Sequence, residues 1–428
     1  MSNRPEQPSA RPYRDSHRTS HWGVLVGSVL CVLALVVTAL YGWRIGWFAS
    51  MTGNDVAASS AAADAARNTP QQLARSVTPK PDHSPAGKAH RMVNAMDMDT
   101  RIGQLVMAPL YAGNAPASLS SLIADRHVGS VLIIGKWTGG VASVRAAADQ
   151  LRGYAPGDNR LIISTDQEGG WVQHLTGPGF DRMPTAVDQG TMSTNQLRQS
   201  ASVWGSQLAA AGINVDLAPV LGMVVVNRAA NAPIGALYRD FGLDAAGNAA
   251  HGTAFVQGMA NAGVQSAIKH YPGLGAVTGN TDFTADGILD TTTTLDGTEI
   301  KAFDTTIDQA DPAMVMMALA TYQAIDPNEP AVFSSIIIDG HLRGDLGYDG
   351  VVISDSMSAA AVSAYDTTQL GIKLVEAGGD LACIGDTNYV APILDGLSTR
   401  AASDPAFANK VTQSAIRVMT LKIKMGLA

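Results

Sequence analysis

Cysteine is nearly absent from this chain of 428 residues, which contains only Cys31 and Cys383. Both stand in apolar stretches, so we expect no disulfide framework. Basic residues are scattered and the formal net charge is −8, which argues against nucleic acid as a partner, because phosphate binding needs a concentrated basic face. No cluster of His, Cys and Glu has the spacing of metal ligands, and we expect no metal ion and no cofactor.

Charge is missing from one long apolar run, residues 22–43. Its length suits the roughly 20 residues that a helix needs to cross a bilayer, so we expect a transmembrane signal-anchor. Residues 1–21 are polar and contain several arginines, which predicts a cytoplasmic tail and places the rest of the chain outside the cytoplasm. A cleaved signal peptide is the alternative, although the run exceeds the roughly 7–15 apolar residues usual there.

Periodicity is missing from residues 44–87, which are rich in Ala, Ser, Thr and Pro. This composition is typical of a flexible linker, which would hold the folded body away from the membrane. The folded body is therefore expected to be residues 88–428.

From residue 88 onward, short apolar runs alternate with longer Ala-rich amphipathic segments, the pattern of strands joined by crossover helices. Eight units in about 340 residues indicate an α/β fold, a (β/α)8 barrel of the TIM type with loop insertions. A doubly wound open sheet is the alternative. The predicted strands are Leu105–Leu110, Val128–Ile134, Leu161–Thr165, Ile213–Val220, Ser266–His270, Ala313–Leu319, Gly350–Ser354 and Asp380–Ile384.

Polar residues stand at or after the ends of several predicted strands. In a barrel these ends share one rim, which carries the active site. The residues are Asp166 and His174 after the third strand, Arg239 after the fourth, Lys269 and His270 at the end of the fifth, and Asp355 after the seventh. A lone aspartate at the tip of a buried strand, such as Asp355, is a candidate nucleophile.

These segments, in this order, resemble the N-terminal barrel domain of glycoside hydrolase family 3, especially its single-domain β-N-acetylhexosaminidases. The resemblance spans roughly residues 95–428. Each piece is weak alone, but the ordered set is specific. The pieces are Ile102-Gly103-Gln104-Leu105, Asp166-Gln167-Glu168-Gly169-Gly170, Lys269-His270-Tyr271-Pro272-Gly273, Leu342-Arg343, Gly347-Tyr348-Asp349-Gly350 and Ser354-Asp355-Ser356-Met357.

The resemblance implies a retaining double displacement on a β-linked sugar, with N-acetylglucosamine of cell-wall fragments as the expected substrate. It places Asp355 at the nucleophile. The alternative for Asp355 is a helix cap, since Asp favours that position and residues 356–361 are compatible with a helix.

The resemblance also assigns sugar contacts. Asp166 matches a carboxylate that grips sugar hydroxyls, and Lys269 with His270 matches a pair of sugar-binding donors. Arg239 corresponds to another sugar-contacting arginine, and His174 falls where this branch has a substrate-binding arginine. The alternatives are a structural loop role for Asp166, a core histidine for His270, and an ion pair of Arg239 with Asp240 or another neighbour.

The loop after the fifth strand departs from the family pattern. The hexosaminidase branch has an Asp-x-His dyad there, whose histidine is the general acid and base, and the same register here contains Asn280-Thr281-Asp282. In one hypothesis Asp282 is the proton donor, which requires desolvation because an exposed aspartate titrates at about 3.9. In the other, proton transfer has been lost. The sequence therefore predicts a membrane-tethered, extracytoplasmic glycosidase, with a catalytically impaired glycan-binding surface module as the alternative.

Overall fold

The computed structural model describes residues 82–428. The expected cytoplasmic tail, the membrane segment 22–43 and most of the linker lie outside the described residues. Within 82–428, no helix combines the length and the apolar character that a membrane span requires. Helix α2 (Pro85–Ala95) begins three residues before the expected start of the body, because Ser84 caps it through the backbone N–H of Gly87 and Pro85 suits the first helical turn.

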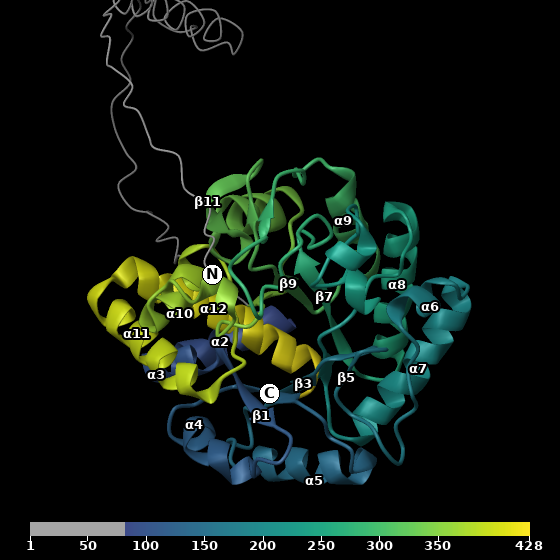
Figure 1. The fold of residues 1–428 in the computed structure, drawn as a ribbon. Coiled ribbons are helices and arrows are strands. Elements are labelled where there is room, and N and C mark those ends of the chain that lie inside the picture. Colours follow the sequence, from purple (N-terminus) through teal and green to yellow (C-terminus); the bar gives the residue numbers. More distant parts are fainter. Residues whose placement is uncertain (1–81) are drawn as a thin grey trace, which may run out of the picture. The chain divides into compact units, whose positions relative to one another are not determined.

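Eight parallel strands form the central sheet of residues 82–428 (Figure 1). Each pairs with the next along the chain, and β1 also pairs with β13. A parallel bridge between Ile353 and Leu381 joins β12 to β13 and closes the ring. The fold is thus the predicted barrel and not the open-sheet alternative. The strands are β1 (Val106–Tyr111), β2 (Ser130–Ile134), β3 (Ile162–Thr165), β6 (Val215–Asp216), β7 (Gln265–Tyr271), β9 (Met314–Met317), β12 (Val351–Ser354) and β13 (Ala382–Cys383).

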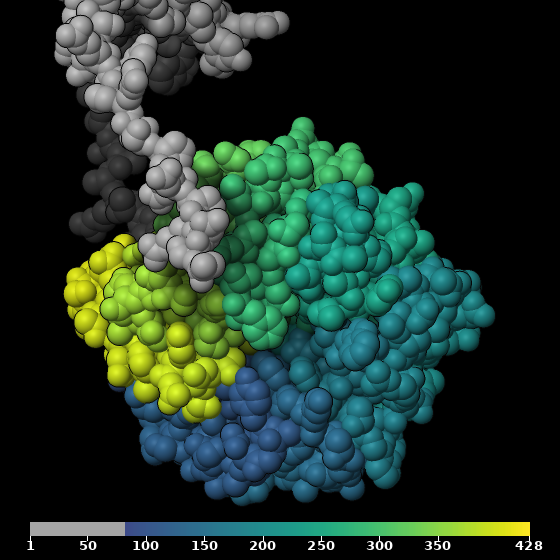
Figure 2. Space-filling model, viewed as in Figure 1, coloured from purple at the N-terminus to yellow at the C-terminus, as the bar shows by residue number. Residues whose placement is uncertain are grey.

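Helices connect the strands and surround them (Figure 1). In Figure 2 the colours follow one another round the surface, so successive units of the chain are neighbours in space. Between β9 and β12 the connection is π-helical, over Ile336–Asp345. The remaining helices are α3 (Met98–Gly103), α4 (Ser120–Ala124), α5 (Gly140–Arg152), α6 (Ala186–Gly190), α7 (Thr194–Ala210), α8 (Ala245–Asn261), α9 (Thr298–Ala310), α10 (Thr367–Glu376), α11 (Val390–Ser403) and α12 (Pro405–Lys424).

Short strands decorate the loops at the end of the barrel where the parallel strands finish. A hairpin of β4 (Gln167–Gly169) and β5 (Val172–Gln173) follows β3. A second small sheet joins β8 (Leu289–Asp290), β10 (Thr321–Tyr322) and β11 (Asp326–Pro330). These additions account for much of the length beyond a minimal barrel.

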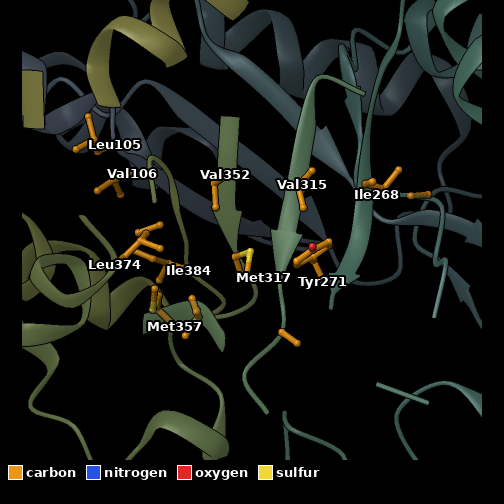
Figure 3. Close-up of a cluster of buried hydrophobic side chains, with 14 of the residues drawn as sticks. Leu105, Val106, Ile268, Tyr271, Val315, Met317, Val352, Met357, Leu374 and Ile384 are labelled. Carbon is orange, nitrogen blue, oxygen red and sulfur yellow. The ribbon is translucent and has the colours of Figure 1, made fainter. Parts of the chain in front are cut away.

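Side chains alternate along the barrel strands between two apolar clusters. On β9, Met314 and Met316 belong to an inner cluster, whereas Val315 and Met317 belong to the larger outer cluster between strands and helices. Figure 3 shows part of this outer cluster, where Val352 of β12 lies near Val315 and Met317. All four residues of β9 are buried, as expected for a methionine-rich strand that fills the core.

Helix α12 closes the end of the barrel where the strands begin. Val418 and Leu421 pack into the inner cluster. Beside them, the side chain of Lys422 is fully buried, and its Nζ donates to Gln104 Oε1 at 2.7 Å and to Asn159 Oδ1 at 2.9 Å. Both acceptors are neutral amides, so the ammonium charge lacks compensation from them. Burial therefore lowers the pKa of Lys422 to about 7.

This buried amine predicts a pH-dependent stability. Lysine in the unfolded chain titrates at about 10.4, so between about pH 7 and pH 10 the unfolded state binds more protons than the folded state does. The free energy of unfolding should therefore rise with pH in this window, by up to about 1.4 kcal/mol per unit. Urea unfolding at pH 7, 8 and 9 should show this rise in the wild type, and the Lys422→Met variant should lack it.

The control is Lys424→Met, which removes an exposed lysine from the same helix. It should keep the pH dependence of the wild type. Parallel curves for the wild type and Lys422→Met would mean that Lys422 stays charged in the folded protein.

Candidate active site

All seven residues that the sequence singled out line one cavity of about 460 Å³, a volume typical of ligand pockets. They come from loops and strand ends that are far apart in the sequence, and the ring of parallel strands gathers them at one edge. They are Asp166, His174, Arg239, Lys269, His270, Asp282 and Asp355.

A buried ion cluster forms the floor of the cavity. Glu168 and Lys269 are 3% and 1% exposed, and Lys269 Nζ lies 2.7 Å from Glu168 Oε1. Arg239 donates to both carboxylate oxygens of Glu168, from Nε at 2.9 Å and from Nη2 at 2.8 Å. Burial alone would raise the pKa of Glu168, but the charges of Arg239 and Lys269 outweigh it and hold this pKa well below its usual range. The carboxylate is therefore ionised at any physiological pH.

The arginine of this cluster pairs with a residue other than the one the sequence suggested. Arg239 binds Glu168, while Asp240 accepts two hydrogen bonds from Arg228, at 2.6 and 2.8 Å. An ion pair of Arg239 with Asp240 is therefore wrong, whereas the expected ion pair with another neighbour is present, with Glu168 as the partner. Arg239 has an ion-pair partner and also reaches the cavity, so its structural role and a sugar contact are compatible.

Asp166 and His174 form one wall. Asp166 follows β3, and its Oδ1 accepts a hydrogen bond from Lys269 Nζ at 2.5 Å. His174 Nδ1 donates to the carbonyl oxygen of Gly135 at 3.0 Å, which leaves Nε2 3.9 Å from Asp166 Oδ2. The hairpin that carries His174 turns at Gly169, whose φ is +98° and whose missing Cβ leaves room for the Pro184 carbonyl oxygen.

Asp355 lies at the tip of β12, opposite His270. Its backbone N–H donates to Met317 O, and its Oδ1 accepts from the N–H of Ser356 at 2.8 Å. Oδ2 lies 3.9 Å from His270 Nε2. The helix-cap alternative is wrong, because the next helical segment is a 3₁₀ turn that begins only at Ala360 and has Ala359 as its cap. Burial, and then the negative charge of Asp282, raise the pKa of Asp355 to about 7.

His270 is a buried histidine that also reaches the cavity. Burial, followed by the positive charges of Arg239 and Lys269, lowers its pKa well below the ordinary value. The imidazole is therefore neutral at pH 7. The register of β7 against β9 shifts between Ile268 and Tyr271, and the consecutive residues Lys269 and His270 both line the cavity.

The loop after β7 is fastened to the loop after β12. The N–H of Ala360 donates to Asp282 O at 3.2 Å and the N–H of Ala361 donates to Thr281 O at 3.0 Å. Within the loop, Asn280 Oδ1 accepts from the N–H of Asp282 at 3.0 Å. Asn280 thus shapes the turn that carries Asp282, and these bonds bring Asp282 into the cavity that contains Asp355.

The side chain of Asp282 is exposed at the mouth of the cavity. The surrounding walls still remove part of its hydration, and this burial, together with the negative charge of Asp166, raises its pKa above the ordinary value. The direction is the one that the proton-donor hypothesis requires, because a raised pKa keeps a carboxylic acid protonated at higher pH.

Two acidic residues of this region had no role in the sequence-based prediction. Glu168 is two residues after Asp166, and the alternation of side chains along extended chain is the signal that places both on one face. Asp216 ends β6, but the predicted strand 213–220 hid it in the middle of a run. It is fully buried, accepts the N–H of Gln167 at 2.9 Å, and burial raises its pKa well above the ordinary value.

Comparisons with known proteins identify the family that the motifs resemble. The model of the glycosyl hydrolase family 3 N-terminal domain matches residues 97–421. The beta-hexosaminidase LpqI of Mycobacterium tuberculosis is 31% identical over 322 residues, which cover 72% of this chain and 78% of LpqI. A beta-hexosaminidase of Alkalilimnicola ehrlichii is 31% identical over 65% of this chain and 81% of its own.

Solved structures give the same result. The crystal structure of a beta-N-acetylhexosaminidase from Beutenbergia cavernae superposes with a TM-score of 0.74 at 41% identity, and the match covers 77% of this chain and 99% of that one. A family 3 beta-N-acetylglucosaminidase from Paenibacillus superposes with a TM-score of 0.69 at 29% identity, over 78% of this chain and 63% of the other. The resemblance noted in the motifs is confirmed, and the chain belongs to glycoside hydrolase family 3 and is a glycoside hydrolase.

Proposed function

We propose that this glycoside hydrolase removes terminal β-linked N-acetylglucosamine from cell-wall glycan fragments with retention of configuration. The observation that carries the proposal is the meeting of two carboxyl groups, Asp355 and Asp282, in one cavity whose floor and walls are lined with groups that can bind sugar hydroxyls. The choice of sugar is supported by the relatives named above, which are hexosaminidases or acetylglucosaminidases.

Asp355 is the nucleophile of the proposed mechanism. Its carboxylate attacks the anomeric carbon from the face opposite the leaving group, while the carboxylic acid of Asp282 gives its proton to the departing glycosidic oxygen. In the second step Asp282, now ionised, takes a proton from water. The water oxygen bonds to the anomeric carbon, and the bond to Asp355 breaks.

The remaining cavity residues hold the terminal sugar during both steps. Asp166 accepts hydrogen bonds from hydroxyl groups, and Lys269 and Arg239 supply donors from the floor. His174 offers Nε2 as a further hydrogen-bonding group. Positive charge from Lys269 and Arg239 also favours the ionised form of Asp355, which is the form that attacks.

The two acids titrate as a pair, because each lies in a partly desolvated site and the charge of Asp282 raises the pKa of Asp355. The reactive form of the proposed mechanism is the one in which the proton is on Asp282 and Asp355 is ionised. The position of Asp282 in the cavity favours a proton-transfer role over the alternative of a glycan-binding module that has lost it.

We further propose that the enzyme is tethered to the cell membrane through residues 22–43, with the barrel outside the cytoplasm. The uncharged run and the arginines before it support this arrangement.

Replacing the nucleophile gives the first test. The Asp355→Ala variant should hydrolyse 4-nitrophenyl N-acetyl-β-glucosaminide more slowly by a factor on the order of 10⁴ or more, since the covalent route is lost. A 5-fluoro glycosyl fluoride of N-acetylglucosamine should label the wild type, and peptide mass spectrometry should locate the adduct on Asp355. Turnover by Asp355→Ala at the wild-type rate, or an adduct on another residue, would contradict the assignment.

Replacing the proton donor gives the second test. The Asp282→Asn variant should lose about 10²–10⁴-fold in rate on an alkyl or disaccharide substrate, whose leaving group needs a proton. It should lose much less on a 2,4-dinitrophenyl glycoside, whose leaving group departs as an anion. The control is Asp286→Asn, an exposed aspartate of the same loop that does not line the cavity. Equal losses on both substrates would exclude Asp282 as the acid.

The pH profile of the same variant adds an independent measurement. In the wild type, activity should fall as the pH rises above about 7, since the shared proton is then lost. In Asp282→Asn this alkaline limb should disappear. The acidic limb should stay in place, because it reports the ionisation of Asp355 beside a protonated, neutral Asp282, and the amide that replaces this acid is neutral as well.

The tether predicts a fractionation result. The full-length enzyme expressed in its host should remain with the membrane pellet after washing with high salt and should be released by detergent. The chain that begins at residue 82 should lack this attachment. Recovery of the full-length chain in the soluble fraction, with an N-terminus downstream of residue 43, would instead indicate a cleaved signal peptide.

A further inference from the structure

Exposed apolar side chains gather at the catalytic end of the barrel. Among the residues that the structure describes, eight large hydrophobic side chains are prominently exposed, and six of them belong to the C-terminal ends of barrel strands or the loops that follow. Large exposed apolar groups grouped around a cavity are typical of a binding surface. The six are Tyr111, Trp171, Val225, Tyr238, Phe283 and Leu289.

Only two of these six, Tyr111 and Phe283, line the cavity itself. Phe283 is 83% exposed and Tyr111 is 41% exposed. Trp171 is also strongly exposed, but it lies on the tip of the hairpin after β3 and is not among the lining residues. The cavity therefore passes from a charged, buried floor to an aromatic mouth.

Phe283 is adjacent in the chain to the proposed proton donor, which places it on the leaving-group side of the cavity. The proton donor has to stand beside the glycosidic oxygen, and Phe283 directly follows Asp282. The sugar that is attacked occupies the floor, near Lys269 and Asp355, which are 1% and 17% exposed. A ring at the mouth, next to the acid, therefore faces the group on the other side of the scissile bond.

Hydrogen bonds fix the backbone of Phe283 and the side chain of Tyr111. The N–H of Phe283 donates to Asn280 O at 3.0 Å, and the preceding residue is bonded to the N–H of Ala360. The hydroxyl of Tyr111 donates to the carbonyl oxygen of Gly385 at 2.8 Å. Groups that are already ordered cost less conformational entropy when a ligand binds.

We propose that Phe283, together with Tyr111, forms an apolar binding surface for the ring of the leaving group and selects substrates in which that group is a pyranose. The C–H faces of a pyranose pack against an aromatic ring, and the contact removes exposed apolar surface from water. This inference rests on the proposed function and names the class of substrate as a β-linked oligosaccharide.

The test compares two substrates that differ only beyond the scissile bond. One is the β-1,4-linked disaccharide of N-acetylglucosamine, and the other is N-acetylglucosaminyl fluoride, whose leaving fluoride is too small to reach the mouth. In Phe283→Ala, the ratio of kcat/KM for the disaccharide to that for the fluoride should fall about 10-fold or more. Phe283→Trp should restore the ratio, and the control Trp171→Ala, an exposed aromatic outside the cavity, should leave it unchanged.

An unchanged ratio in Phe283→Ala would overturn the inference, whether both rates fall together or neither falls. Displacement of Asp282 would lower the ratio too, because fluoride departs without a proton, but it would not weaken binding of the disaccharide. A lower ratio with unchanged disaccharide binding would therefore overturn the inference and mean that Phe283 only helps to place Asp282.

Calorimetry on the Asp355→Asn variant separates this inference from the proposed function. Even if the wild type hydrolyses neither substrate, Phe283→Ala in this background should weaken binding of the disaccharide about 10-fold and leave binding of free N-acetylglucosamine unchanged. Equal binding of the disaccharide with and without Phe283 would again overturn the inference.

Discussion

The cavity depends on the ion pairs that the buried carboxylate of Glu168 forms. This carboxylate is held by Arg239 and Lys269, which come from the loop after β6 and from β7. Charges buried in this way cost several kcal/mol each in lost hydration, and only close pairing offsets the cost. Removing one partner from such a pair typically costs about 3–5 kcal/mol. The same cluster therefore joins three parts of the barrel rim and supplies the positive charge at the floor of the cavity.

The positive charge of this cluster also acts on Asp282 and Asp355, the two candidate catalytic acids. Burial raises the pKa of Asp355 and of Asp282, whereas the positive charges of Lys269 and Arg239 lower both. Asp355 and Asp282 together therefore retain a proton near neutral pH, although the loop after β7 contains no histidine at residue 282. Under the proposed mechanism, a family 3 enzyme without the histidine of its branch retains a proton donor, because the loop places the carboxyl group of Asp282 in the cavity.

The placement of this loop comes from ordinary backbone bonds. Asn280 shapes the turn around Asp282, and the N–H groups of Ala360 and Ala361 fasten it to the segment after β12. The proposed role of Asp282 accounts for an amide at residue 280, since an aspartate donor has no tautomer that a second acid must select. The same turn presents Phe283 at the mouth, so the proposed proton donor and the proposed leaving-group contact depend on one short segment.

Sequence reasoning predicted the eight strands and most of the cavity residues from local patterns, whereas His174 and Asp282 became candidates through the register of the family resemblance. A buried parallel strand is a short apolar run, and its end is marked by the first polar residue, as at Asp355. The roles of Glu168 and Asp216 were missed for different reasons. Glu168 looked like part of a turn motif, and Asp216 was hidden because β6 ends four residues before the apolar run does.

What the sequence determined by itself is therefore the order of the units, the family and the set of polar residues that share one edge, since each is written in short stretches of chain. Only the tertiary structure decided that Arg239 binds Glu168 instead of Asp240, that Asp282 enters the cavity and that Phe283 stands at its mouth. These features depend on side chains and loops that meet across 71 residues or more, as Arg239 and Glu168 do. Such pairings are chosen by packing and charge in three dimensions, and no local pattern encodes them.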